Sequence, residues 1–153
     1  MTATNHALTG AVVGMSFGQP IAVAAVAFVS HFVLDVLPHY GAPHTNNRPK
    51  GKSFARVTTI DALLLIGFFV VILTGRFESA GLILLGAVMA MSPDIAWVYR
   101  FAAQESWGKK TPRPMNWFNN LHASIQWGER TYGWVYEIVY FVGVTSLIYL
   151  ITQ

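Results

Sequence analysis

Long runs of apolar residues, separated by polar or basic connections, dominate this chain. Five runs stand out, and they cover residues 7–17, 21–37, 58–74, 79–97 and 133–151. A helix that crosses a bilayer needs about 20 apolar residues, with a range near 17–25. The last four runs reach this length, whereas the first is short and rich in small residues. We therefore expect an all-α polytopic transmembrane helical bundle of five spans, or of four spans and a re-entrant arm.

The composition agrees with a protein that sits in a bilayer. Hydrophobic residues make up 54% of the 153 residues and charged residues only 11%, against about 25% charged in an ordinary soluble domain. The mean hydropathy is +0.45. Too few charges are present to cover a small soluble enzyme, and the absence of cysteine excludes a disulfide scaffold. We expect a single integral membrane domain over residues 1–153, with membrane lipids as its partners.

The basic residues lie in the connections between the apolar runs and predict the orientation. Residues 38–57 and 98–132 contain nine of them, while the opposite connections contain only Arg76. The positive-inside bias then places the N-terminus and both long loops in the cytoplasm and the C-terminus outside. Residues 1–5 contain no Lys or Arg, so we expect no secretory signal. The net charge of +3 follows from this bias, and we expect no binding of nucleic acid.

A stripe of glycines marks the first apolar run. Gly10, Gly14 and Gly18 recur at every fourth residue, so one face of a helix would lack side chains and a second helix could approach closely. The alanine-rich run over residues 21–37 is the neighbour that we expect there.

Aromatic residues gather around the second long loop and predict a helix at the membrane surface. Trp117, Phe118, Leu121 and Ile125 have helical spacing. We therefore predict an amphipathic helix over residues 116–127 that lies in the inner interface.

The second apolar run carries a histidine and an acid that share one helix face. His31 and Asp35 are four residues apart. Counted from the outer end of the run, they would lie about 15 and 21 Å deep. An unpaired carboxylate inside the bilayer costs at least about 2.5 kcal/mol, so Asp35 needs a partner. A divalent metal shared with His31 is one interpretation, and a plain hydrogen bond that holds two helices together is the other.

The predicted topology brings further imidazoles and a carboxylate to the same side of the membrane. His6, His39, Asp94 and His122 all fall there. Imidazole and carboxylate ligands together suit zinc, manganese or iron. The metal hypothesis takes His6, His31, Asp35 and Asp94 as ligands, with His39 or His122 as an acid or base.

Each of these residues also has a structural interpretation. His6 can be an ordinary first-turn residue, Asp94 a helix-start charge after Ser92-Pro93, and His122 an interfacial histidine. Asp61 and Glu137 can be helix-start charges, outer-sphere partners of a metal site or part of a proton path.

Three motifs together resemble a known family. They are Asn5-His6-Ala7-Leu8-Thr9-Gly10, the stretch Ser30-His31…Leu34-Asp35…Pro38-His39, and Ser92-Pro93-Asp94. In this order they resemble the membrane-bound, metal-dependent hydrolases of the LexA-regulated inner-membrane type. The resemblance covers the first two thirds of the chain and implies an integral membrane protein with a metal-dependent hydrolase site at His6, His31, Asp35 and Asp94. Many relatives carry a second acid after Pro-Asp, where this chain has Ile95, which argues against a two-metal site.

Three functions follow from these observations. The first is a metal-dependent hydrolase, with zinc as the expected metal, acting on a phosphoester or lipid headgroup at the cytoplasmic face of the cell's inner membrane. The second is a non-catalytic assembly or interaction protein, for which the glycine stripe and aromatic belt suffice. The third is a small transporter or proton relay that uses Asp35, Asp61 and Glu137.

Overall fold

The chain folds into helices, as the apolar runs predict. The computed structural model describes residues 1–41, 44–45, 48–49, 52–106 and 117–153. Within these residues it has the helices α1 (Ala3–Ser16), α2 (Pro20–Val36), α3 (Lys52–Thr74), α4 (Ala80–Ser106), α5 (Trp117–Ile125) and α6 (Trp134–Ile151), with a 3₁₀ turn, η1 (Gln126–Gly128). The strands β1 (His39–Tyr40), β2 (His44–Thr45), β3 (Arg48–Pro49) and β4 (Glu129–Arg130) have two residues each. The all-α class is therefore confirmed.

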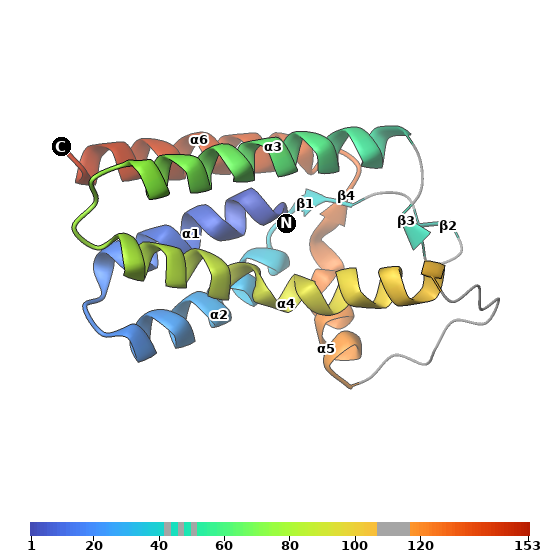
Figure 1. The fold of residues 1–153 in the computed structure, drawn as a ribbon. Coiled ribbons are helices and arrows are strands. Elements are labelled where there is room, and N and C mark those ends of the chain that lie inside the picture. Colours follow the sequence, from blue (N-terminus) through green and yellow to red (C-terminus); the bar gives the residue numbers. More distant parts are fainter. Residues whose placement is uncertain (42–43, 46–47, 50–51, 107–116) are drawn as a thin grey trace.

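Helix α1 lies in the middle of the bundle and contacts α2, α3, α4 and α6. The five long helices run along a common direction, and α5 lies across the end of α2, near the N-terminus (Figure 1). Helices α3 and α4 extend beyond α5 on this side, and the C-terminus lies at the opposite end of the bundle. The parallel pairing of β1 with β4 joins the residues that follow α2 to those that follow η1. This pairing holds α5 and η1 across the end of α2.

The glycine stripe packs against a different helix from the one that we predicted. A Cβ atom on Gly10 would overlap the Gly86 carbonyl oxygen, and a Cβ atom on Gly86 would overlap the Gly10 oxygen. The close neighbour of this face is thus α4, and the expectation that residues 21–37 fill that place is wrong. The two backbones touch because neither residue has a side chain. A Cβ atom on Gly18 would meet no other atom within 4 Å, so Gly18 takes no part in this contact.

Helix α4 continues through Pro93, which is buried, and ends at Ser106. Asp94 is therefore a mid-helix residue, and its interpretation as a helix-start charge is wrong. Pro93 has no N–H for the carbonyl of Met89 four residues earlier. The Ser92 hydroxyl donates to that carbonyl over 2.8 Å instead. This local hydrogen bond lets the apolar helix α4 accommodate a proline next to Asp94.

Two helices are long and apolar enough to cross a membrane. They are residues Ala55–Thr74 of α3 and Trp134–Ile151 of α6, and only 6% of each span is buried within the protein. Pro20–Val36 and Ala80–Ala96 are apolar but shorter. Among the described residues, two candidate spans are thus established. Lys50, Lys109, Lys110 and Arg113, which carry part of the predicted charge bias, lie outside the described residues.

Candidate metal centre

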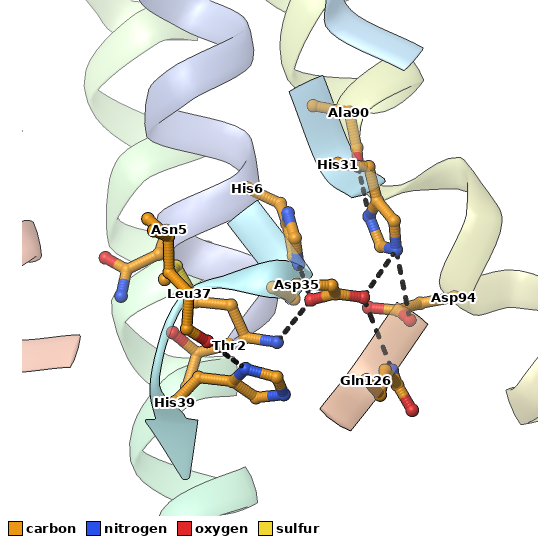
Figure 2. A network of polar contacts seen from close by, with 12 residues as sticks. Thr2, Asn5, His6, His31, Asp35, Leu37, His39, Ala90, Asp94 and Gln126 are labelled. Carbon is orange, nitrogen blue, oxygen red and sulfur yellow. Dashed lines mark hydrogen bonds and ion pairs between the residues drawn. The ribbon is translucent and has the colours of Figure 1, made fainter. Parts of the chain in front are cut away.

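Four side chains from three helices meet at the end of the bundle that α5 crosses. They are His31 and Asp35 of α2, Asp94 of α4 and His122 of α5, and one ligand atom from each lies within 4.8 Å of the others. The side chains of His31, Asp35 and His122 are fully buried, whereas that of Asp94 is 31% exposed. Asp94 is therefore the member of the group that faces the outside. Figure 2 shows His31, Asp35 and Asp94 pointing toward one another.

The separations of the ligand atoms fit a small cation. His31 Nε2 lies 3.0 Å from His122 Nε2 and 3.2 Å from Asp35 Oδ2, and His122 Nε2 lies 2.9 Å from that oxygen. Both imidazole nitrogens lie 3.7 Å from Asp94 Oδ1. Four ligand atoms placed tetrahedrally about 2.0–2.1 Å from a zinc ion lie about 3.3–3.4 Å apart. Five of the six pairs of ligand atoms lie 2.9–3.7 Å apart, a range that brackets that value. The sixth pair, the oxygens of Asp35 and Asp94, lies within 4.8 Å, so this group can hold a metal ion.

A hydrogen bond to the backbone orients His31 and turns its Nε2 toward the other members of the group. His31 Nδ1–H donates to the Ala90 carbonyl over 2.8 Å, so in the neutral ring Nε2 presents a lone pair. That lone pair points at two carboxylate oxygens, from Asp35 and Asp94 (Figure 2). Electron-rich atoms repel one another unless a proton or a metal cation lies among them. A metal-bound histidine typically donates its second ring N–H to a backbone carbonyl, as His31 does here.

His6 lies beside the group of four but outside it. Its Nε2 is 3.2 Å from Asp35 Oδ1, the carboxylate oxygen turned away from His31 and His122. Its ring stacks on that of His31, with centroids 4.0 Å apart. His6 is fully buried; its Nδ1 has no hydrogen-bond partner among the described residues, and the Asp35 contact is the one given for its Nε2. The α-ammonium group of Met1 also contacts Asp35 Oδ1, over 2.6 Å.

Two residues of the crossing segment complete the surroundings of Asp35. His122, which the sequence offers as an acid, a base or an interfacial residue, lies among the possible ligands. Gln126 follows it by one helical turn, and its Nε2 lies 3.3 Å from Asp35 Oδ2. We did not predict Gln126, although its spacing of four residues from His122 was a usable signal. Phe32 and Phe118 pack edge-on against His122 and shield it from solvent.

His39 is buried but does not join the group of four. Its Nδ1–H donates to the Leu37 carbonyl over 2.8 Å, which holds the ring just beyond the end of α2 (Figure 2). Burial lowers the pKa of His39, and the nearby α-ammonium group of Met1 lowers it further. The ring is therefore neutral at physiological pH. Its role as an acid or base stays a prediction.

Asp61 and Glu137 both bond to the start of α1. Asp61 lies in the middle of α3, so its interpretation as a helix-start charge of that helix is wrong, whereas Glu137 lies in the first turn of α6. Asp61 accepts from the backbone N–H groups of Ala3 and Thr4, over 3.0 Å each. Glu137 accepts from the N–H and hydroxyl of Thr2 and from the amide of Asn5. Carboxylates favour the N-terminus of a helix because its first N–H groups are unpaired and its dipole is positive there. These two acids thus fix the end of α1 that carries His6.

Comparison of this chain with protein-family models, with curated proteins and with solved structures finds no match. Its chemistry therefore has to be argued from the residues themselves. A buried pair of imidazoles and a pair of carboxylates, one of them reachable from outside, can bind a divalent cation and leave one side open to a second molecule.

Proposed function

We propose that this protein is a membrane-bound, metal-dependent hydrolase that acts at the cytoplasmic face of the inner membrane on a phosphoester or lipid headgroup. The observation that carries the proposal is the convergence of His31, Asp35, Asp94 and His122 on one point. The resemblance of the His6, His31–Asp35 and Pro93-Asp94 motifs to membrane-bound metal-dependent hydrolases supports the same function. Two nitrogen and two oxygen donors suit zinc best, with manganese or iron as the alternatives.

The residues around the site have distinct parts in this function. A bound divalent metal would supply Lewis acidity and lower the pKa of a bound water. His31, Asp35 and His122 hold it in a buried position, while the partly exposed Asp94 lies on the side from which a substrate arrives. Gln126 donates to Asp35 and keeps that carboxylate oriented. His6 occupies the other oxygen of Asp35 and is available as a further ligand or as a proton acceptor.

The membrane position is part of the proposal. In the proposed arrangement α3 and α6, which pass the span criterion, cross the bilayer. The shorter α2 and Ala80–Ala96 of α4 cross it with them around α1, which would give four to five spans. Seventeen helical residues extend about 25 Å, close to the 30 Å of the hydrocarbon core. Helix α5 crosses the bundle end with Trp117 and Leu121 exposed, as suits a helix lying among headgroups. The metal group then sits in the inner half of the bilayer, just below the headgroups.

Metal analysis of the purified protein tests the proposal most directly. We expect about one tightly bound metal ion per chain by elemental mass spectrometry of protein in detergent. The variants His122→Ala and Asp35→Asn should lose it, because each removes a ligand. Glu78→Gln is the control, since Glu78 is an exposed acid between α3 and α4 and should leave the metal content unchanged.

A hydrolysis assay then separates an enzyme from a metal-stabilised bundle. Vesicles of anionic phospholipid and a soluble aryl phosphate are offered to the metal-loaded protein and to His122→Ala. Release of phosphate or headgroup by the intact protein alone supports the function. Absence of bound metal in the intact protein, or equal turnover in both proteins, contradicts it.

A further inference from the structure

A second feature of the protein lies on the far side of α1 from the metal group. A cavity of about 330 Å³ opens between α3 and α6, the two helices that pass the membrane-span criterion. Its walls are mainly apolar and include Val57, Ile60 and Leu64 of α3 and Trp134, Ile138 and Phe141 of α6. The start of α1 closes it on the inner side through Thr2, Thr4 and Asn5.

We propose that this cavity binds one acyl chain of a membrane lipid. Both walls belong to helices whose outer surfaces are apolar and unburied, so the opening faces hydrocarbon once these helices cross the bilayer. The lining on α3 runs from Val57 to Leu64 and that on α6 from Trp134 to Phe141. Seven helical steps extend about 10 Å, roughly two thirds of one leaflet of the 30 Å core. A groove of this length and composition fits part of a single chain.

The polar groups at the inner wall argue against a charged or strongly polar occupant. Asp61 and Glu137 line the cavity, but the backbone and side chains at the start of α1 already use both carboxylates. Neither acid is therefore left to bind a cationic ligand. Among the described residues that line the cavity, one buried side-chain atom has no hydrogen-bond partner: Asn5 Oδ1, in a side chain that is almost fully buried. The headgroup hydroxyls of a lipid such as phosphatidylglycerol are donors of the kind that this oxygen lacks.

The cavity and the metal group share α1 as their partition. Asn5 points away from Asp35, while its neighbour His6 points toward Asp35 (Figure 2). A lipid held here would place its polar end next to the chain start that borders the site. The inference rests on the membrane placement in the proposed function, but it needs neither the metal nor hydrolysis.

Photolabelling in vesicles tests this site. The probe is phosphatidylglycerol with a photoreactive diazirine in one acyl chain, and the labelled residues are mapped by mass spectrometry. We expect the label on the cavity residues of α3 and α6. Leu64→Trp should abolish it because the indole fills the cavity. Leu63→Trp is the matched control, because Leu63 is 64% exposed and its side chain does not line the cavity.

A second pair of variants, on the α6 wall of the cavity, keeps the test valid when one variant fails to fold. Ile138→Trp should also abolish the cavity label, and Val139→Trp, at an exposed neighbouring position, should retain it. Thermal unfolding of all four variants identifies any that fail to fold. Equal labelling in both members of each pair, or label spread evenly over the outer faces of α3 and α6, overturns the inference.

The metal site provides the final control. His122→Ala should lose metal and keep the cavity label, since His122 lies on the other side of α1. Loss of metal with intact labelling would contradict only the proposed hydrolase, and loss of labelling specificity with intact metal would contradict only the lipid site.

Discussion

Removal of the Glu137 carboxylate tests whether the start of α1 is fixed by acids from neighbouring helices. Glu137 is 6% exposed. Its two oxygens accept from four groups: the N–H and hydroxyl of Thr2, the side-chain amide of Asn5 and the N–H of Tyr40. Glu137→Ala leaves all four without this acceptor. Glu137→Gln keeps the size and one oxygen but places an NH₂ group where donors already point.

The expected loss follows from these bonds. A hydrogen bond to a charged group contributes about 1.5–3 kcal/mol, and an orphaned buried donor costs about 1–3 kcal/mol. Water can reach Thr2 and Tyr40, which are partly exposed, but not Asn5. We therefore expect Glu137→Ala to lower the free energy of unfolding by about 3–5 kcal/mol, and Glu137→Gln by about half as much. For a chain of this size that corresponds to a fall of about 10 °C in Tm.

Thermal unfolding in detergent, followed by tryptophan fluorescence, measures this difference. Glu78→Ala is the matched control, because Glu78 is an exposed acid and its removal should change stability by no more than about 0.5 kcal/mol. The reasoning is refuted when Glu137→Ala unfolds at the same temperature as Glu78→Ala. It is also refuted when Glu137→Gln is the more damaging of the two changes at position 137.

Three further predictions use the same assay. Gly86→Leu should lower the free energy of unfolding by about 3 kcal/mol, because the leucine side chain would meet the backbone of α1. Gly81→Ala, in open space on the same helix, should leave that free energy unchanged or raise it by up to about 1 kcal/mol. Equal losses in the two variants would contradict the contact between Gly86 and α1. Burial lowers the pKa of His39 in the folded protein. Below about pH 6.5 the His39 imidazole therefore binds a proton in the unfolded chain but stays neutral in the folded one. Stability should thus fall as the pH drops from about 6.5 through the folded pKa, and His39→Gln should flatten this slope; an unchanged slope would count against it. Zn²⁺ at 100 times its Kd should raise the free energy of unfolding of the intact protein by about 2.7 kcal/mol. It should have no effect on His122→Ala. An equal gain in both proteins would show that zinc binds outside the group of four.

The sequence alone predicts the helices well because long apolar runs strongly favour helical structure. The runs over residues 21–37, 58–74, 79–97 and 133–151 all lie within or almost within helices, and an amphipathic helix lies at the place expected from Trp117 and Leu121. The end of α4 is not predicted correctly. Ser92-Pro93 is typical of the start of a new helix, whereas here the Ser92 hydroxyl replaces the bond that Pro93 cannot make.

Spatial neighbours are harder to predict than elements. A glycine face shows that some helix comes close, but α2 and α4 both offer small residues, and only their arrangement in space selects Gly86 of α4. The sequence predicts only part of the metal group, because the remaining members are brought together by the arrangement of the helices in space. His31 and Asp35 follow from helical spacing, whereas the place of His122 depends on the two-residue pairing of β1 with β4, which no sequence pattern reveals.

The candidate ligands are spread widely along the chain, and this has a consequence for biosynthesis. His31 and His122 are 91 residues apart, so a ribosome must add 91 residues after His31 before the last imidazole can arrive. The helices made first therefore have an incomplete ligand set, which disfavours premature loading with the wrong ion. A truncated product that stops before α5 cannot assemble the group of four at all.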